Sequence, residues 1–371
     1  MPAGPASPGQ QGQGPAGRRR RRRGRGGNRP LSNASPQPYA GGGGRPPVQR
    51  RGRRGRSGGG GGNGQQPAKR RGLELLRDLQ QAGAALDPTE RLILELLPGQ
   101  GAPPYGDRTT GRCLDIISPL GRGQRCLIVS PPKAGKTRIL QSIAASVAHN
   151  HPDVAIYALL VDERPEEVTD FTRNTPANVI AASSDMSIQE HIETTENAME
   201  TVAALVLEGR DVVLLLDSIT RLARAYNNAS EGTGRTLSGG LDAATMQAPR
   251  MIFGAARKVE GSGSLTIVGT ALIDTGSRMD QVIFEEFKGT GNSEIYLSRE
   301  LAERRIYPAI DVAKSGTRKE EKLYPAEIVP RLHLLRRGLA GLHPQEAMTK
   351  LLELMNRCKT NAEIWELLAR A

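Results

Sequence analysis

The 371-residue sequence predicts an α/β fold with a mostly parallel sheet, preceded by a disordered tail rich in Arg and Gly. From residue 126 onward, short apolar runs alternate with loops and amphipathic stretches. The apolar runs lack polar alternation, which indicates strands buried on both faces between layers of helices. In a doubly wound sheet of this kind, ligands bind at the carboxyl ends of the strands.

The tail comprises residues 1–72, which hold 17 of the 51 Lys and Arg, 21 of the 44 Gly, and no Asp or Glu. Their few large apolar side chains bury too little surface to offset the loss of chain entropy on folding. The other 299 residues carry 34 basic and 39 acidic side chains, so the net charge of +12 is a property of the tail. Clustered Arg favours binding to nucleic-acid phosphates, and a solubilising role is the alternative.

A short segment links the tail to the α/β region. Leucines at helical spacing from Leu73 to Leu79 predict one helix, and Asp87-Pro88 predicts the start of a second that ends at Leu97. The Gly- and Pro-rich stretch that follows is expected to be a loop. We therefore divide the chain into three parts: the tail 1–72, a helical segment and linker 73–110, and an α/β domain 111–371 with a helical C-terminus.

Within the α/β domain, the apolar runs and amphipathic stretches place the elements in order. The expected strands are 126–130, 154–161, 178–182, 212–217 and 265–273, and the expected helices are 137–149, 165–172 and 187–208. After residue 320 the pattern is mostly helical.

The strongest motif is SPPKAGKT at 130–137, because it follows an expected strand and opens an expected helix. Backbone N–H groups and a helix N-terminus in this arrangement hold phosphate oxygens. In such loops the lysine, here Lys136, reaches the β and γ phosphates, and the hydroxyl of Thr137 ligates Mg²⁺. The strict pattern has Gly where this chain has Ser130. The motif predicts ATP and Mg²⁺ as ligands.

Two carboxylates are expected near this loop. Asp217 ends the run VVLLLD, where an acidic residue orders the water shell of Mg²⁺; the alternative is a capping residue for the next helix. Glu163 follows the neighbouring run and is a candidate for orienting and deprotonating the attacking water. Asp162, Glu166 and Glu167 compete with it, and a solvated acidic loop is the alternative.

Hydrolysis also needs a cation against the γ-phosphate, often supplied by a neighbouring subunit. Arg318, Arg305 and Arg221 are candidates, and surface ion pairs are the alternative. Two Gly-flanked loops, 232–240 and 287–292, each present one cation, Arg235 and Lys288. Such loops suit transient contact with phosphates, although plain connecting loops fit the composition equally.

Three cysteines, Cys113, Cys126 and Cys358, lack the spacing of a metal or redox pair and are expected to be ordinary thiols in a reducing compartment. No apolar run approaches the ~20 residues that cross a bilayer, and no secretory signal is evident. We expect a cytoplasmic protein.

Several long motifs together resemble the carboxyl-terminal motor of the Rho family of transcription termination factors, over roughly residues 86–371. These motifs are PPKAGKT, DERPEEVTDF, LLLDSITRLARAY, FGAAR, ALIDTGSRMD, EEFKGTGN, and RIYPAID followed by SGTRKEE. The family also has a serine at the start of its phosphate loop. The resemblance implies a RecA-like P-loop ATPase core in a homohexameric ring, with ATP at the subunit interfaces and single-stranded RNA in the centre. It further implies an RNA-dependent ATPase and helicase that moves 5′ to 3′ and releases transcripts from RNA polymerase.

The resemblance also implies roles for individual residues. Glu163 would be the general base and Arg318 an arginine finger acting across the interface, while Tyr307 would stack on adenine. The residues implied to bind ATP are Lys133, Ala134, Gly135, Lys136, Thr137, Arg138, Arg164, Asp217, Arg221, Arg305 and Tyr307, with Thr137 and Asp217 also at the metal. The residues implied to bind RNA are Arg235, Thr236, Ser238, Gly239, Lys288 and Gly289.

The sequence departs from the family upstream of the motor. The family carries there a helical domain and an OB-type barrel that captures RNA on aromatic residues. Only residues 73–97 look ordered ahead of this motor, so we expect that barrel to be missing and the tail to be its only replacement. Residues 183–191 also differ from the family pattern.

Three alternatives stay open. One is a Rho-like, RNA-stimulated ATPase without termination activity, and another is an Arg/Gly-rich RNA-binding scaffold. The third, at the level of the fold, is a RecA-type recombinase or a rotary ATPase subunit. Intact Lys136, Asp217, Glu163 and Arg318 argue against the scaffold, and the two Gly-flanked loops argue against the third alternative.

Overall fold

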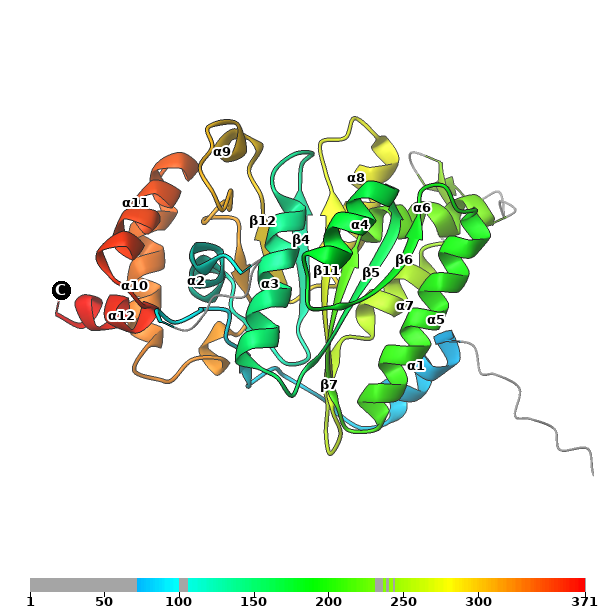
Figure 1. The fold of residues 1–371 in the computed structure, drawn as a ribbon, viewed down its shortest axis with the longest axis horizontal. Helices are drawn as coiled ribbons and strands as arrows, with labels where there is room; N and C mark the ends of the chain where they lie inside the picture. Colours follow the sequence, from blue (N-terminus) through cyan, green and yellow to red (C-terminus); the bar gives the residue numbers. More distant parts are fainter. Residues whose placement is uncertain (1–71, 100–105, 231–235, 238–239, 243, 371) are drawn as a thin grey trace, which may run out of the picture. The chain divides into compact units, whose positions relative to one another are not determined.

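A computed structural model describes residues 72–99, 106–230, 236–237, 240–242 and 244–370 (Figure 1). The expected tail, up to residue 71, lies outside these residues. In the described part, no helix is both long enough and apolar enough to cross a membrane.

The centre of the fold is a nine-stranded, mostly parallel sheet, as predicted. Its main strand order is β13-β12-β4-β11-β7-β5-β6, and all neighbours from β12 to β6 are parallel. The parallel strands are β12 (Ser293–Tyr296), β4 (Arg125–Ser130), β11 (Ser264–Leu272), β7 (Asp211–Asp217), β5 (Ala155–Glu163) and β6 (Asn178–Ser183). The five expected strands are therefore confirmed.

Antiparallel strands extend this sheet at its margins. β13 (Gly316–Thr317) pairs with β12, while β10 (Arg257–Val259) pairs with β11 and with β1 (Ala85–Leu86). These three strands and β12 contain only two to four residues each. The sequence prediction relied on longer apolar runs, so it did not find them. Two further two-stranded antiparallel sheets lie among the described residues: β2 (Arg91–Leu92) with β3 (Leu120–Gly121), and β8 (Thr236–Leu237) with β9 (Leu241–Asp242).

Each face of the sheet packs against its own apolar core. Along β4, Cys126 and Ile128 belong to one core, and Leu127 and Val129 to the other, because successive side chains of a strand point to opposite faces. All four side chains are fully buried. A strand buried in this way shows an uninterrupted apolar run, which explains why the sequence predicted it.

The first core is covered by α2 (Arg108–Ile117), α3 (Lys136–Asn150), α4 (Pro165–Arg173), α9 (Arg299–Glu303), α10 (Val329–Ala340), α11 (Pro344–Arg357) and α12 (Asn361–Ala369). The second is covered by α1 (Gly72–Gln81), α5 (Ile188–Leu207), α6 (Ile219–Ala229), α7 (Gln247–Gly254) and α8 (Arg278–Lys288). A short 3-10 helix, η1 (Glu320–Lys322), precedes α10. In Figure 1 the three C-terminal helices gather beside α2, and α1 lies against α5.

The predicted helix from Asp87 to Leu97 is wrong, although the first linker helix is confirmed as α1. The segment is extended: Leu92, Leu94 and Leu96 are buried, while Ile93 and Leu97 are 41% and 45% exposed. This burial has a period of two, which belongs to an extended chain rather than to a helix.

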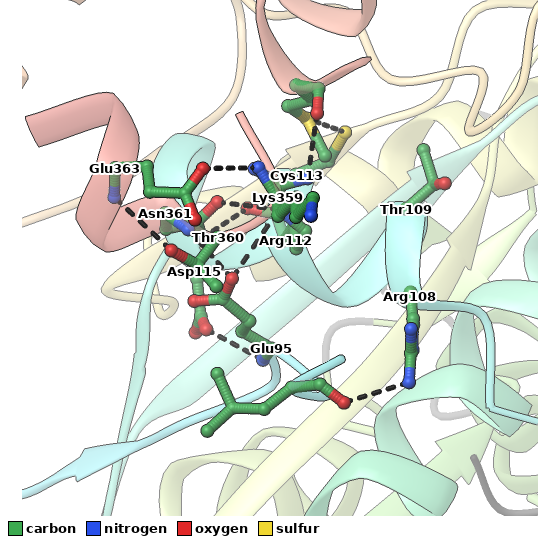
Figure 2. A network of polar contacts seen from close by, with 12 residues as sticks. Glu95, Arg108, Thr109, Arg112, Cys113, Asp115, Lys359, Thr360, Asn361 and Glu363 are labelled. Carbon is green, nitrogen blue, oxygen red and sulfur yellow. Dashed lines mark hydrogen bonds and ion pairs between the residues drawn. The ribbon is translucent and has the colours of Figure 1, made fainter. Parts of the chain in front are cut away.

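Contacts with α2 hold this segment in its extended form (Figure 2). The buried carboxylate of Asp115 accepts hydrogen bonds from the backbone N–H groups of Leu94 and Glu95, at 3.1 and 2.8 Å. The expected loop also ends earlier than residue 110, because Asp107 caps α2 by accepting from the N–H groups of Thr109 and Thr110. The contacts of Asp115 join residues about 20 positions apart, so local periodicity does not reveal them. The three cysteines are buried and free, in keeping with the prediction of ordinary thiols.

Candidate active site

The loop between β4 and α3 turns sharply around two residues with left-handed backbone conformation. Lys133 has φ 64° and Gly135, which precedes the first residue of α3, has φ 97°. A side chain at Gly135 would meet only the ring of Tyr307, at 3.8 Å, so the backbone angle and not space favours glycine here. The α3 N-terminus has no side-chain cap, which leaves its first N–H groups able to bind an anion.

A pocket of about 360 Å³ opens at this helix N-terminus. It is lined by Asp107, Thr110, Lys133, Ala134, Gly135, Arg138, Ile139, Tyr307, Pro308 and Ala309. Tyr307 is 45% exposed, and its hydroxyl donates to the carbonyl of Ala302 at 3.3 Å. A half-exposed aromatic ring beside an anion-binding helix end is suited to a nucleotide base next to its phosphates.

Lys136, the first residue of α3, bridges two carboxylates at the carboxyl ends of neighbouring strands. Its Nζ lies 2.8 Å from Oε1 of Glu163 and also donates to Oδ1 of Asp217. Burial alone would lower the pKa of Lys136, but the two carboxylates outweigh burial and raise it. The lysine is therefore charged, and it neutralises part of an otherwise acidic buried site.

Glu163 is the buried member of the four acidic residues that compete for the role of base. It is 4% exposed, whereas Glu166 and Glu167 lie exposed on α4 and Asp162 is half-buried. Burial raises the pKa of Glu163, and the negative charge of Asp217 raises it further. The positive charges of Lys136 and Arg221 lower this pKa, but the net effect is a raised value. A carboxylate with a raised pKa accepts a proton more readily than an ordinary one.

Asp217 ends β7 and does not cap the following helix. Ser218 caps α6, because its hydroxyl accepts from the N–H of Arg221 at 3.2 Å. The alternative interpretation of Asp217 as a helix cap is therefore wrong. The fully buried hydroxyl of Thr270 donates to Oδ1 of Asp217 at 2.7 Å. Sequence reasoning missed Thr270, although a polar residue near the end of an apolar run was a usable signal.

Thr137 and Asp217 offer hydroxyl and carboxylate oxygens, the hard donors that Mg²⁺ prefers. Among the described residues, no three His, Cys, Asp or Glu side chains gather as a metal cage. Mg²⁺ at nucleotide sites is usually held by one or two carboxylates together with substrate phosphates and water. The charged Lys136 between Glu163 and Asp217 shows that this position already attracts a cation.

Arg221 contacts the acidic side of the site. Its Nη1 lies 3.1 Å from Oδ2 of Asp162 and also donates to the carbonyl of Asp162, and its Nη2 is 3.5 Å from Oε2 of Glu163. Arg164 directly precedes α4, and its Nη1 lies 3.8 Å from Oε1 of Glu167.

Two exposed arginines flank the pocket. Arg138 lies on the first turn of α3 and lines the pocket directly. Arg305 precedes Tyr307 by two residues and has φ 60°. The structure thus brings Lys133, Arg138 and Tyr307 to one pocket, with Arg305 close along the chain.

Arg318 lies at the amino end of β4, whereas the phosphate loop follows the carboxyl end of that strand. Its N–H donates to the carbonyl of Asn292 at 2.9 Å, and Asn292 pairs with Arg125, the first residue of β4. The phosphate loop begins at the opposite end of β4, after Ser130, and six residues of strand span roughly 20 Å. Arg318 of one chain is therefore not part of that chain's own pocket.

The expected RNA-binding residues fall into two groups. Arg235, Ser238 and Gly239 lie outside the described residues, whereas Thr236 belongs to β8. Lys288 ends α8, with its Nζ 5.7 Å from the centre of the Phe284 ring, and Gly289 caps that helix. Like Arg318, the loop after Lys288 lies at the amino end of β4, because Arg125 binds the carbonyl of Thr290 at 2.9 Å.

Comparison with known proteins identifies the family. Residues 111–317, more than half of the chain, match the nucleotide-binding domain of the ATP synthase alpha/beta family. Transcription termination factor Rho of Haemophilus influenzae is 52% identical over 262 residues, which cover 71% of this chain and 62% of that protein. Rho of Micrococcus luteus is 53% identical over 285 residues, which cover 77% of this chain and 40% of that protein. The chain thus spans less than two thirds of these relatives.

Solved structures agree on the fold. An ATPase from a bacterial type III secretion system superposes with a TM-score of 0.58 at 23% identity, over 68% of this chain and 69% of that one. The ATP synthase subunit NeqB of Nanoarchaeum equitans superposes with a TM-score of 0.63 at 20% identity, over 79% of this chain and 78% of that one. The family match, read with the site geometry, means that this chain is an ATP-hydrolysing enzyme of the ATP synthase alpha/beta nucleotide-binding family, and that it is similar to transcription termination factors Rho.

Proposed function

We propose that this protein is an RNA-dependent ATPase that moves along single-stranded RNA 5′ to 3′ and terminates transcription by releasing RNA from RNA polymerase. One observation carries the enzymatic part: the P-loop lysine Lys136, which directly follows Gly135 of the pocket lining, joins buried Glu163 and Asp217. The identity of 51–54% to Rho proteins supports the RNA and termination part. The proposed site of action is the cytoplasm.

In the proposed binding step, the N–H groups at the α3 N-terminus and the Lys136 ammonium hold the ATP phosphates. Lys136 exchanges part of its contact with the two carboxylates for contact with the phosphates. Tyr307 stacks on the adenine, and the exposed Lys133 and Arg138 add positive charge at the rim. Thr137 and Asp217 would hold Mg²⁺, which would supply charge neutralisation at the phosphates.

In the proposed chemical step, Glu163 orients the attacking water and accepts its proton. Its burial and raised pKa favour proton acceptance, and Lys136 and Arg221 fix the orientation of its carboxylate. Thr270 holds Asp217 in place from the neighbouring strand. Arg164 directly follows Glu163, and Arg305 precedes Tyr307 by two residues. Both arginines are proposed to contact the ATP phosphates as well.

The proposed assembly is a homohexameric ring in which Arg318 acts on the ATP of the neighbouring copy. The location of Arg318 at the opposite end of β4 from the phosphate loop supports this, since it requires a second chain to bring the two together. The proposed RNA contacts are Arg235, Thr236, Ser238 and Gly239 in one loop and Lys288 and Gly289 in the other. The basic tail, residues 1–72, is proposed to add electrostatic attraction for RNA.

The test measures ATP turnover by the full chain with and without poly-C, poly-U and poly-A. Turnover should rise with RNA, and the Lys136→Ala variant should be inactive with every RNA because it lacks the phosphate-binding charge. Release of a transcript from a stalled polymerase then tests termination separately. Turnover that is equal with and without all three RNAs would contradict the proposal.

A further inference from the structure

Asn292 lies between the turn proposed to bind RNA and β12, the strand that pairs with β13 just before Arg318. It directly follows the Lys288–Gly291 turn, whose first two residues are exposed and whose last residue is buried, and it precedes β12. The backbone carbonyl of Asn292 accepts from the N–H of Arg318 at 2.9 Å, although the two residues are 26 positions apart. One residue thus contacts both functional segments.

The side chain of Asn292 is fixed by β4 and the turn before it. Its Oδ1 accepts from the N–H of Arg125 and from Nε2 of Gln124, both at 2.8 Å. Its own N–H donates to the carbonyl of Arg125 at 3.0 Å. Gln124 is 1% exposed and Asn292 is half-buried. Loss of this oxygen would remove the partner of the Arg125 N–H, while Nε2 of Gln124 would keep the carbonyl of Asn292, at 3.2 Å.

A second attachment joins the residues next to Asn292 and Arg318. The hydroxyls of Ser293 and Thr317 lie 3.0 Å apart, and both contact the hydroxyl of Ser118. Thr317 also donates to the carbonyl of Pro119 at 2.7 Å. All three hydroxyl residues are buried, so the start of β12 and the end of β13 form one rigid unit.

Arg125 completes the connection from the loop side. Its Nε donates to the carbonyl of Thr290 at 2.9 Å and its Nη1 to the carbonyl of Ala256 at 3.0 Å. Burial lowers the pKa of Arg125, and the nearby positive charge of Arg318 lowers it further. Arg125 thus binds the turn through the carbonyl of Thr290 and binds Asn292 through its backbone.

We propose that Asn292 is a positioning residue that couples RNA contact at the Lys288–Gly291 turn to the placement of the Arg318 guanidinium. This inference rests on the proposed function, because it requires the turn to bind RNA and Arg318 to act on ATP. Displacement of the turn by RNA moves Asn292, whose carbonyl holds the backbone of Arg318. The link is a single backbone hydrogen bond flanked by buried hydroxyl contacts, so a shift of Asn292 is passed to the backbone of Arg318.

The first test is Asn292→Ala, which removes the Oδ1 anchor. ATP affinity, RNA affinity and turnover without RNA should stay as in the unchanged protein, while the RNA-stimulated kcat should fall. The fall should lie in the range of roughly 5–150-fold that is typical of coupling between sites. Asn292→Asp keeps a side-chain oxygen acceptor beside Arg125 and should retain most of the stimulation.

Asn361→Ala is a matched control, because it removes the same side chain from a different hydrogen-bonded cluster (Figure 2). Asn361 accepts from Nε of Arg112 at 3.0 Å and donates to its carbonyl at 3.2 Å, where α2 meets α12. This control should lower Tm and leave RNA stimulation unchanged. If Asn361→Ala loses stimulation to the same extent as Asn292→Ala, the effect is general destabilisation and the inference fails.

Two further variants separate this inference from the proposed function. If the unchanged protein shows no RNA stimulation, or if Lys288→Ala and Arg318→Ala are both fully stimulated, the proposed function itself fails. If both are impaired and Asn292→Ala is still fully stimulated, only the inference is overturned. Should Asn292→Ala fail to fold, Asn292→Gln displaces the same oxygen by one methylene; it should also lose stimulation, and full stimulation in it would overturn the inference.

Discussion

Glu163 shows how one buried side chain acquires a chemical property from its neighbours. Four acidic residues follow β5 or lie near its end, and their identities alone do not distinguish them. Burial separates Glu163 from the other three, and its contacts with Lys136 and Arg221 fix its direction. A group that is buried, oriented and raised in pKa is suited to deprotonate water.

We therefore predict that Glu163→Gln retains ATP binding and loses turnover by a factor of roughly 10²–10⁴. The amide keeps the size of the side chain but does not accept the proton of the attacking water. Steady-state turnover at saturating RNA measures the loss, and binding of a fluorescent ATP analogue measures retention. Glu166→Gln, on the exposed face of α4, is the control and should behave as the unchanged protein. An inactive Glu166→Gln with an active Glu163→Gln would reassign the base.

At the scale of elements, the extended segment before α2 depends on one buried carboxylate. Asp115, on α2, binds the backbone of Leu94 and Glu95, and Arg112 on the same helix binds the carbonyl of Met355 and the side chain of Asn361 (Figure 2). These contacts join α2 to the segment on one side and to the C-terminal helices on the other. The stability of this junction is therefore linked to the charge of Asp115.

Burial raises the pKa of Asp115 to about 6, against an ordinary value of 3.8. Arg91 and the two backbone N–H groups oppose this rise, and Glu95 adds to it. Because the folded protein holds the proton more tightly than the unfolded chain, this contribution to stability is full below pH 3.8. It is lost as the pH rises through about 6, and it amounts to at most about 3 kcal/mol.

The prediction is that Asp115→Asn removes this pH dependence, because the amide is neutral at every pH. Tm of the unchanged protein should fall relative to Tm of the variant as the pH rises from 4 to 7. Thermal unfolding followed by circular dichroism at matched ionic strength measures both values. A difference in Tm that stays constant over this range would show that Asp115 keeps an ordinary pKa.

At the scale of the whole molecule, the two halves of the proposed catalytic apparatus lie at opposite ends of the sheet. The phosphate loop, Glu163 and Asp217 follow the carboxyl ends of β4, β5 and β7. Arg318 and the turn after Lys288 lie at the amino end of β4. In the proposed assembly, a second copy brings its amino-end residues to the pocket of the first.

We predict that mixing Arg318→Ala with Lys136→Ala restores part of the ATP turnover that each variant lacks alone. An interface between the two supplies a sound phosphate loop from one chain and a sound arginine from the other. With random assortment at equal amounts, about one quarter of the interfaces in a cyclic ring are of this kind. Turnover across a series of mixing ratios measures the recovery, and native mass spectrometry shows that mixed assemblies form. Mixed assemblies without any recovery would show that Arg318 does not act on a neighbouring copy.

The sequence by itself determined the elements whose signals are local. The run CLIVS predicted β4 because a strand buried on both faces shows no alternation, and the Gly-Lys-Thr that follows marked the turn into α3. Asp217 and Glu163 were found as candidates because they end such runs. The motifs shared with the Rho family added roles that position alone did not supply, notably for Arg318 and Tyr307.

Tertiary structure decided what depends on distant partners. The segment after Asp87 is extended because Asp115 and β3 bind its backbone, and a local helical pattern cannot report those contacts. Thr270 is placed on Asp217 by the pairing of β11 with β7. Asn292 meets Arg318 across 26 residues of chain. Burial and hydrogen bonding between residues far apart arise only when the strands pair, so neither periodicity nor motif spacing contains them.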